Sequence, residues 1–487
     1  MAQQILNLDE LSALERRFNN LLPQGELMRR AGRAVADKIL ELRPEAQHIV
    51  IVCGPGNNGG DGFAAALFLK NKGKRVTCAL IGCDKPKAED ALMMYEAWVA
   101  AGGVVIADPY SADKADVVVD AIFGTGMKKA LSGDFLDAAM WFNERRALRV
   151  SVDLPTGIDA MTGRWVGGIP GCHADLTMAM LAPKAGCYMC EGADAAGEVV
   201  VNELDVSVPL STLGIIDQSD FRHVCEPRDK NSHKGTYGSV TVVGGENGTI
   251  GAALLAARAA LVLGAGRVTV EMMGSRAPAF DPVYPELMFA PEAADLAAST
   301  CNVVGCGMGF GDRARERLEA AIASPAALVL DADALRMMAQ DQSLQDAVLA
   351  RRSHTVITPH PGEAAAILRT SVEKVNADRI TACRELSLQT GAISILKGAG
   401  SVIALRSSRT WINPTGNAML ATAGSGDVLS GMLGALFAQH YDLVSATLGA
   451  VYLHGAASEG VYAGLTAGEI AANAAAILDE MRANFTR

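Results

Sequence analysis

The chain has 487 residues, of which 50% are hydrophobic and 20% are charged, so it is long enough for about two or three domains with sizeable cores. A net charge of −11 and an aromatic content of 5% argue against a nucleic acid or an anionic membrane as a partner. The sequence shows neither the apolar core of a signal peptide nor an apolar run long enough to cross a membrane. Its ten cysteines are scattered, and we therefore expect a cytoplasmic protein with reduced thiols.

In the first 205 residues, short apolar segments alternate with segments of helical periodicity. The pattern predicts strands at residues 48–53, 75–81, 104–107, 116–122, 148–153, 174–181 and 198–205. It predicts helices at residues 26–42, 88–101 and 134–143, and a further helix that opens in the glycine-rich segment 54–63 and continues to residue 69. This alternation is typical of a parallel sheet covered on both faces, so we expect a doubly wound α/β domain.

The periodicity fades over residues 207–230 and then resumes. We place a domain boundary in this stretch, which gives the domains 1–220 and 221–487. Further strands are predicted at residues 238–244, 267–271, 302–305, 327–331, 355–358, 392–397 and 401–405. Further helices are predicted at residues 250–263, 312–323, 362–368, 372–389, 426–438, 442–459 and 467–483. The second part is therefore a larger α/β domain.

The segment GPGNNGGDGF (residues 54–63) joins the first long strand to a helix and contains a G-x-G-x-x-G pattern. That pattern alone favours a dinucleotide-binding dehydrogenase, although a single fingerprint is weak evidence. It also contains Asn57, Asn58 and Asp61, whose side chains are suited to a hard cation or to sugar hydroxyls and amides. A pyrophosphate cradle needs mainly backbone groups, so these side chains indicate a different ligand.

Two more polar loops follow apolar strands in this half. Asp120 opens DAIFGTG and Asp153 opens DLPTGID. Each aspartate taken alone fits a capping role as well as a functional one. Ligands of open α/β sheets bind at the carboxyl ends of the strands, so three such loops at one edge favour a binding site.

The segment NPTGNAMLATAGSGDVLSG (residues 413–431) leads a glycine-rich loop into an apolar helix. The first N–H groups of a helix and its dipole favour a phosphate or another anion there. Asp427 lies at this helix entrance, where we expect its ionised form to be favoured and to accept a proton. The alternative is that Asp427 only caps the helix.

Two other motifs of this half follow predicted strands. TPHPGE (residues 358–363) contains His360, which fits a capping role or a ligand contact, and LKGAGS (residues 396–401) contains Lys397, which can face an anion. Together with AGSGD, these motifs resemble the ribokinase-like superfamily, which implies a nucleotide over the sheet and phosphoryl chemistry at the GxGD sequence.

The motifs NNGGDG, DAIFGTG and DLPTGIDAMTG together resemble the NAD(P)H-hydrate epimerase domain. The resemblance implies a Rossmann-like three-layer sheet that interconverts the R and S hydrates of NADH and NADPH, with Asp153 as an acid/base or orienting group. It implies potassium ligands at Asn58, Asp120 and Thr156, where the family usually has serine at the last position. It implies substrate contacts at Asn57, Asn58, Gly59, Gly60, Asp61, Gly124, Thr125, Gly126, Met127, Lys128, Lys129 and Ala130.

The full motif set of the second half, HKGTYGSVTVVGG, TPHPGE, LKGAGS and NPTGNAMLATAGSGDVLSG, resembles the ADP-dependent NAD(P)H-hydrate dehydratases. The resemblance implies that Asp427 is the catalytic base and that ADP is the co-substrate. It also implies Mg²⁺ as a cofactor, which Glu363 would influence. It implies nucleotide contacts at Lys397, Gly398, Ala399, Gly400, Ser401 and Gly426, and hydrate contacts at Ala252, Gly309 and His360.

Both resemblances together imply a repair enzyme that epimerises the hydrates and dehydrates the S form to NAD(P)H, converting ADP to AMP and phosphate. The expected partners are the two hydrates, ADP and further copies of the same chain. One alternative is a ribokinase-like kinase of a small molecule fused to a non-catalytic NAD(P)H-binding module. A kinase leaves a phosphorylated product, whereas the dehydratase releases free phosphate.

Overall fold

The computed structural model of the chain describes residues 3–407 and 409–485. The chain divides into two compact units, Gln3–Leu213 and a second unit that begins at Gly214. This division falls inside the stretch where the sequence pattern fades, while the functional limits 1–220 and 221–487 stay predictions. Within the described residues, no helix combines the length and the apolar character that a membrane span needs.

The N-terminal unit contains a parallel sheet of seven strands in the order β4-β3-β2-β5-β6-β7-β8. The strands of this sheet are β2 (His48–Cys53), β3 (Arg75–Leu80), β4 (Val104–Ile106), β5 (Val117–Ala121), β6 (Leu148–Val152), β7 (Leu176–Met180) and β8 (Glu198–Asn202). The unit also contains the short strand β1 (Gln4–Ile5), which is not part of this sheet. Its helices are α1 (Leu8–Leu21), α2 (Glu26–Leu42), α3 (Asn57–Asn71), α4 (Glu89–Ala100), α5 (Asp134–Asn143) and α6 (Cys190–Ala195).

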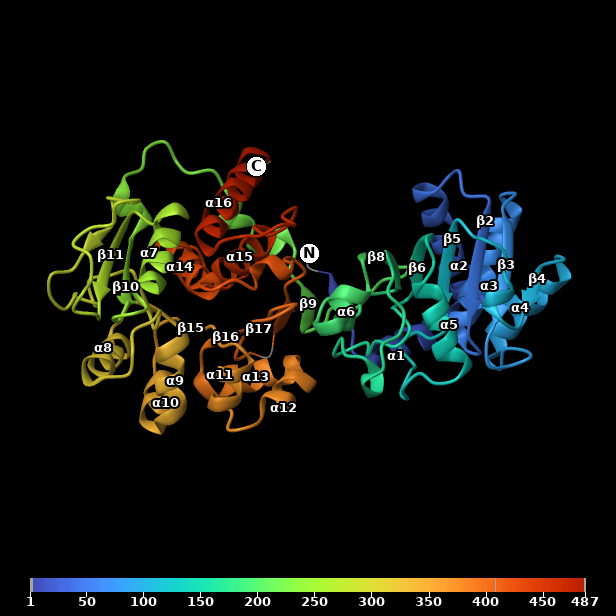
Figure 1. Ribbon diagram of the computed structural model, residues 1–487, viewed down its shortest axis with the longest axis horizontal. Coiled ribbons are helices and arrows are strands. Elements are labelled where there is room, and N and C mark those ends of the chain that lie inside the picture. The colour runs from blue at the N-terminus through green and yellow to red at the C-terminus, as the bar shows by residue number, and fades with distance from the viewer. Residues whose placement is uncertain (1–2, 408, 486–487) are drawn as a thin grey trace. The chain divides into compact units, whose positions relative to one another are not determined.

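Alternate residues of β2 enter different cores, as the two-residue period of a strand requires. Ile49 and Ile51 pack with α1 to α4 on one face of the sheet, and Val50 and Val52 pack with α5 on the other. The sheet is therefore the middle layer of three, as Figure 1 shows in its blue to green half. The doubly wound α/β fold predicted for this half is confirmed.

The C-terminal unit contains a mixed sheet in which the order is β9-β18-β17-β16-β15-β14-β13-β10-β11-β12. β17 pairs antiparallel with β16 and with β18, whereas the neighbouring strands from β16 to β12 in this order pair in parallel. The strands are β9 (Leu213–Ile215), β10 (Ser239–Gly244), β11 (Arg267–Met272), β12 (Met288–Phe289), β13 (Cys301–Val304), β14 (Ala327–Leu330), β15 (Thr355–Ile357), β16 (Ile393–Leu396), β17 (Val402–Ala404) and β18 (Thr410–Ile412).

Helices cover both faces of this sheet (Figure 1). One face packs against α7 (Ile250–Val262), α14 (Ser425–Ala438), α15 (Leu443–Ala456) and α16 (Ala467–Ala483). The other carries α8 (Asp312–Ala323), α9 (Ala332–Gln340), α10 (Gln342–Leu349), α11 (Pro361–Ile367), α12 (Val372–Ala377) and α13 (Arg379–Thr390). Two layers of helices around a central sheet bury both faces of its apolar strands.

The prediction of one helix over residues 372–389 is wrong. The chain forms α12 and α13 there, because Asp378 interrupts the first helix and caps the second. Its carboxylate accepts the Thr381 N–H at 3.0 Å and the Thr381 hydroxyl at 2.7 Å. A side chain that satisfies the exposed N–H groups of a new first turn starts a separate helix.

Candidate active sites

The glycines of the segment 54–63 bring two loops of the N-terminal unit together. β2 and β5 are neighbours at the centre of the sheet, where the strand order reverses. In open α/β sheets the ligand crevice lies outside the carboxyl ends of the strands at such a point, and this region is called the crevice below. A Cβ atom on Gly54 would overlap the carbonyl of Ile122, and one on Gly59 would overlap the carbonyl of Gly54. Gly54 and Gly59 therefore serve close backbone packing, which explains these two glycines without a pyrophosphate ligand. A Cβ atom on Gly56, the middle glycine of the pattern, would meet nothing within 4 Å.

The helix predicted to open within residues 54–63 begins at Asn57. The residues Asn57–Asp61 therefore form the first turns of α3, and the prediction that they form a loop is wrong. Gly56 precedes this helix without any side-chain cap, so the helix starts with unpaired N–H groups. Asn58 is buried, and its Nδ2 atom has no hydrogen-bond partner among the described residues. A buried, unsatisfied amide in a crevice indicates a polar ligand.

Asp120 is fully buried at the end of β5 and accepts four hydrogen bonds. Oδ2 accepts the Thr156 N–H at 2.8 Å and the Ser151 hydroxyl at 2.9 Å. Oδ1 accepts the Thr156 hydroxyl at 2.7 Å and the Ile122 N–H at 3.2 Å. Burial raises the pKa of Asp120 against the effect of these donors, all of which are neutral.

Asp153 lies just after β6 with φ at +72°, a left-handed conformation that strains a residue with a Cβ atom. Its Oδ1 forms an ion pair with Lys184. Its Oδ2 would lie 2.9 Å from a Cβ atom on Gly124, and the Asn58 Oδ1 would lie 3.4 Å from the same atom. The structure therefore brings Asn58, Gly124 and Asp153 to one point of the crevice.

The other predicted contacts of this half lie on the segment from Thr125 to Ala130, which has no helix or strand. Lys128 and Lys129 are exposed, and Ala130 packs close to Gly167. The segment follows Gly124 directly and so borders the same crevice.

Sequence reasoning missed two charged groups of this site. Lys184 is only 4% exposed, and Glu15 lies on α1, for which no helix was predicted. Burial, then the charge of Asp153, raises the pKa of Glu15. Burial, then the charges of Asp153 and Glu15, raises the pKa of Asp61 well above its usual range. A lone lysine inside the apolar stretch 174–196 is the signal that could have identified Lys184.

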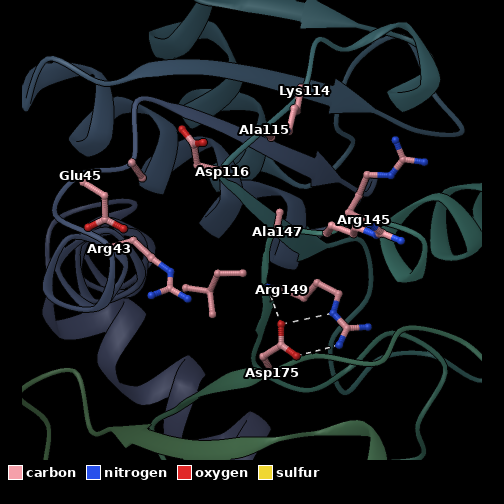
Figure 2. A pocket seen from close by; sticks show the side chains of 12 residues that line it. Arg43, Glu45, Lys114, Ala115, Asp116, Arg145, Ala147, Arg149 and Asp175 are labelled. Carbon is pink, nitrogen blue, oxygen red and sulfur yellow. Dashed lines mark hydrogen bonds and ion pairs between the residues drawn. The ribbon is translucent and has the colours of Figure 1, made fainter.

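A basic pocket lies at the opposite edge of the same sheet (Figure 2). The residues that line it are Arg43, Glu45, Ala46, Lys114, Ala115, Asp116, Arg145, Arg146, Ala147, Leu148, Arg149 and Asp175. Arg149 pairs with Asp175 at 2.7 Å across it. These residues precede or begin β2, β5, β6 and β7, so the pocket is at the amino ends of the strands and is no part of the crevice described above.

In the C-terminal unit, Asp427 lies in the first turn of α14 but does not cap it. The N-cap is Gly424, whose φ of +91° requires glycine or a strained residue. One ligand atom each from Asp427, Asp331 and Cys306 lie within 4.8 Å of one another. The capping alternative is thus wrong, and Asp427 faces a cluster at the carboxyl ends of β13 and β14.

The prediction that the helix entrance favours ionised Asp427 is corrected by its surroundings. Burial and the negative charge of Asp331 raise the pKa of Asp427 to about 6, and Asp333 adds to the shift. A hydrogen bond with Cys306 and the charge of Lys397 oppose it. A carboxyl group with a pKa just below neutrality suits a general base better than one with an ordinary pKa.

Asp331 connects four elements and was not predicted as a site residue. Its Oδ1 accepts the Lys397 ammonium at 2.8 Å and the Ala332 N–H at 2.9 Å, and its Oδ2 accepts the Ser430 hydroxyl at 2.8 Å. Burial opposes ionisation, but the ion pair and these hydrogen bonds outweigh it and lower the pKa of Asp331. A Cβ atom on Gly426 would lie 3.2 Å from the Lys397 Nζ, so this ammonium lies against the start of α14.

Arg379 fixes the backbone of the predicted nucleotide loop, residues 397–401, by hydrogen bonds. The guanidinium is buried and donates to the carbonyls of Leu396, at 3.1 Å, and Ala399. Gly398 has φ at +147° and leaves no room for a Cβ atom beside this guanidinium. The Ser401 hydroxyl closes the turn by donating to Gly398 at 3.2 Å.

His360 caps α11 with its side chain. Its Nδ1 accepts the Gly362 N–H at 2.9 Å, and Glu363 accepts the His360 N–H at 3.0 Å. Burial, followed by the charge of Lys397, lowers the pKa of His360. Its neutral ring thus caps the helix while the substrate contact expected of it stays a prediction.

The two remaining predicted contacts lie on the segments that follow β10 and β13. Gly309 has φ at +75°, and its N–H donates to Asp333 at 3.0 Å. Ala252 is half-buried in the first turn of α7. Asp333, which also acts on Asp427, links this turn to the cluster.

The cluster of Asp427, Asp331 and Cys306 does not fit a Mg²⁺ cage. Mg²⁺ requires about six oxygen ligands in octahedral geometry, whereas this cluster includes a thiol and its Asp331 already has Lys397 as a cation partner. Glu363 is engaged with the cap of α11. These residues therefore do not bind Mg²⁺ directly. They suit a Mg²⁺ ion that is bound to the phosphates of the nucleotide, and they would contact it through those phosphates.

Two family profiles match the chain. The profile described as NAD(P)H-hydrate dehydratase matches residues 240–480, and that described as YjeF-related protein N-terminus matches residues 24–186. A ribokinase-like superfamily protein from Enterococcus faecalis has a TM-score of 0.50 and 20% identity, covering 57% of this chain and 99% of its own. The ribokinase-like fold predicted for the second half is thus confirmed.

Two further relatives are more similar in sequence to this chain than the Enterococcus faecalis protein is. The ADP/ATP-dependent NAD(P)H-hydrate dehydratase from Bacillus subtilis, co-crystallised with ATP/Mg²⁺, is 29% identical with a TM-score of 0.48, covering 53% of this chain and 96% of its own. The bifunctional NAD(P)H-hydrate repair enzyme Nnr of Escherichia coli is 34% identical over 444 residues, which are 89% of this chain and 84% of that protein. With this identity over nearly its whole length, the chain belongs to the bifunctional NAD(P)H-hydrate repair enzymes.

Proposed function

We propose that the two activities of this repair enzyme are divided between the two crevices. The N-terminal unit epimerises the hydrates of NADH and NADPH, and the C-terminal unit dehydrates the S hydrate with a nucleotide as co-substrate. The observation that carries the second assignment is Asp427, whose carboxyl group has a pKa of about 6 at the glycine-rich start of α14. A base of this pKa beside a phosphate-binding helix start is suited to phosphate-assisted loss of a hydroxyl group.

In the dehydratase site, Asp427 accepts the proton of the hydroxyl on carbon six of the nicotinamide ring as that oxygen attacks the terminal phosphoryl group. Hydroxide is a poor leaving group, whereas phosphate is a good one. The bond between carbon six and the phosphorylated oxygen then breaks, carbon five loses a proton to solvent, and the ring double bond re-forms as phosphate leaves. The N–H groups of α14 and the Lys397 ammonium lie where negative charge grows on the transferred group. The residues 397–401 and Gly426 hold the nucleotide, and Ala252, Gly309 and His360 lie around the hydrate.

The co-substrate is ADP, which leaves as AMP, and its phosphates would carry Mg²⁺ into the site. The support for Mg²⁺ in this role is the chemistry of the cluster, which offers no oxygen cage of its own. Bound there, Mg²⁺ neutralises phosphate charge.

In the epimerase site, the residues 57–61 and 124–130 contact the hydrate, and Asp153 exchanges or orients its hydroxyl proton. Asn58, Asp120 and Thr156 would hold potassium. A cation fits there because Asp120 is fully buried and its hydrogen-bond donors are neutral. The Asn58 Nδ2, which has no acceptor among the described residues, is free to donate to an oxygen of the hydrate. When bound, potassium supplies the missing positive charge.

The test uses the full chain, purified R and S hydrates, and ADP or ATP in separate reactions. We expect reduced-nicotinamide absorbance to return with one mole of free phosphate per mole of hydrate, and the R form to be consumed only after epimerisation. A phosphorylated nicotinamide product without recovery of NAD(P)H would show a kinase instead. The same preparation analysed by sedimentation velocity tests the expected homo-oligomer.

A further inference from the structure

Lys184 is a buried cation in the epimerase unit with a defined and unusual environment. Its side chain is 4% exposed, and its ammonium contacts Asp153 Oδ1 and donates to the Met180 carbonyl at 2.6 Å. The Met180 N–H points at the same Oδ1, at 3.4 Å. Burying an ammonium costs several kcal/mol unless it is paired and hydrogen-bonded, so a lysine at this position needs a reason other than packing.

The backbone that carries Lys184 is fixed by its neighbours. It precedes the short 3₁₀ helix Ala185–Cys187, whose Gly186 N–H donates to Ala160 at 2.8 Å. A Cβ atom on Gly186 would overlap the Asp159 carbonyl. The ammonium is therefore presented from a rigid segment that packs on the loop after Asp153.

Asp153 and Leu181, on either side of this ion pair, both have left-handed backbone conformations, with φ at +72° and +68°. Such strain in residues with a Cβ atom persists only where the surroundings impose it, and it gathers at functional sites. The Asp153 N–H donates to Met178 at 2.8 Å, which ties the strained turn to β7. The turn is thus held in a conformation that aims the Asp153 carboxylate toward Lys184 and the crevice.

The two oxygens of Asp153 face different groups. Oδ1 is taken by Lys184, whereas Oδ2 faces Gly124 and the Asn58 side chain, at the start of the predicted substrate loop. Glu15 and Asp61 add two more carboxyl groups near Asp153, and burial together with the Asp153 charge raises the pKa of both. Lys184 is thus the cation that balances a crowded set of acids.

We infer that Lys184 is the positioning residue of the epimerase reaction: by holding Oδ1 of Asp153, it directs Oδ2 at the hydroxyl group of a hydrate bound at Asn58 and Gly124. This inference rests on the proposed function of Asp153. It assigns to Lys184 no contact with the substrate, so its effect must pass through Asp153.

The test is a double-mutant cycle on epimerisation of the pure R hydrate. The reaction is run without nucleotide, so that dehydration does not interfere, and its progress is measured by separating the two epimers. Lys184→Met lowers kcat about 10²-fold, because a small misplacement of a reacting group has that effect. KM changes by less than about threefold, because the substrate contacts remain. In the Asp153→Asn background, Lys184→Met causes no further loss of kcat, because Lys184 then has no carboxylate left to orient.

The double variant removes both charges and leaves no unpaired buried ion, so it keeps the comparison valid if Lys184→Met alone unfolds. Lys184→Arg, which retains the charge, recovers part of kcat. Lys72→Met, on the exposed end of α3, is the matched control and keeps the wild-type rate. A wild-type kcat for Lys184→Met, or a further 10²-fold loss in the Asp153→Asn background, overturns the inference. A wild-type rate for Asp153→Asn overturns the proposed function of Asp153 and the inference with it.

Discussion

The carboxylate groups of Asp331 and Asp427 lie within 4.8 Å of each other, but they have opposite electrostatic surroundings. Asp331 has the Lys397 ammonium at 2.8 Å, which helps to lower its pKa, while burial and the charge of Asp331 raise the pKa of Asp427 to about 6. Two neighbouring acids whose pKa values are driven apart take different roles. Asp331 stays ionised and anchors Lys397, and Asp427 is the one that exchanges a proton.

Replacing Asp427 by Asn tests this assignment directly. The amide has the same shape but cannot accept the hydroxyl proton, so we expect the rate of S-hydrate dehydration to fall by about 10²–10⁴-fold. Epimerisation, which uses the other unit, continues at the wild-type rate. Asp479→Asn, on the exposed side of α16, is the matched control. Retained nucleotide-dependent recovery of NAD(P)H in Asp427→Asn would rule out the base role.

The pH dependence of dehydration follows from the raised pKa of Asp427. The base works only when it is ionised. With a pKa of about 6 for Asp427, we expect kcat/KM to be constant at higher pH and to fall as the pH decreases through this value. The charge of Asp333 contributes to the upward shift, so Asp333→Asn moves this acid limb to lower pH. The measurement is kcat/KM for the S hydrate across the pH range in both proteins. An acid limb that stays in place or moves to higher pH would contradict the assignment.

Removing Lys397 separates stability from chemistry. Lys397→Met leaves Asp331 buried without its cation, and breaking such a pair costs about 3 kcal/mol. Because the Lys397 charge lowers the pKa of Asp427, the acid limb of dehydration also moves to higher pH. Both effects are followed in the full chain by urea denaturation and by the pH profile of activity.

The double variant with Lys397→Met and Asp331→Asn provides the control for this prediction. It carries no unpaired charge, so we expect it to regain most of the lost free energy of unfolding. Equal instability of the single and double variants would show that Lys397 acts through packing rather than through its charge.

The sequence predicted most strands and helices because their apolar periods are strong and their ends carry glycine or proline. The bounds predicted for α2, β2, α5, α8 and α16 are those of the structure. It also predicted the polar segments that follow the strands at one edge, although one of them, Asn57–Asp61, is the start of α3 and not a loop. It could not predict the partners: Asp331 lies 66 residues before Lys397, and only the fold brings them together. The raised pKa of Asp427 likewise depends on burial, which no local motif encodes.

Gly431 fixes the position of α14, and with it that of Asp427. A Cβ atom there would overlap the Ala256 carbonyl of α7, so Gly431→Ala forces the two helices apart. We expect a loss of about 1–3 kcal/mol in stability and a loss of dehydration without an effect on epimerisation. Gly468→Ala in the first turns of α16, where a Cβ atom meets nothing within 4 Å, is the control. It is neutral or stabilises by up to about 1 kcal/mol; equal effects of both substitutions would refute the packing argument.

Thr156 distinguishes a hydroxyl requirement from a shape requirement in the proposed potassium site. Its hydroxyl donates to Asp120 at 2.7 Å and accepts the Phe123 N–H at 3.0 Å. Thr156→Ser keeps both bonds, so we expect epimerisation and its potassium dependence to be preserved. Thr156→Val has nearly the same shape but leaves a buried carboxylate and an N–H with one partner fewer, at a cost of about 1–3 kcal/mol. The expected result is a loss of epimerisation that added potassium restores only in part, measured as rate against potassium concentration with sodium replacing it at constant ionic strength. Full activity of Thr156→Val, with unchanged potassium dependence, would exclude this hydroxyl from the site.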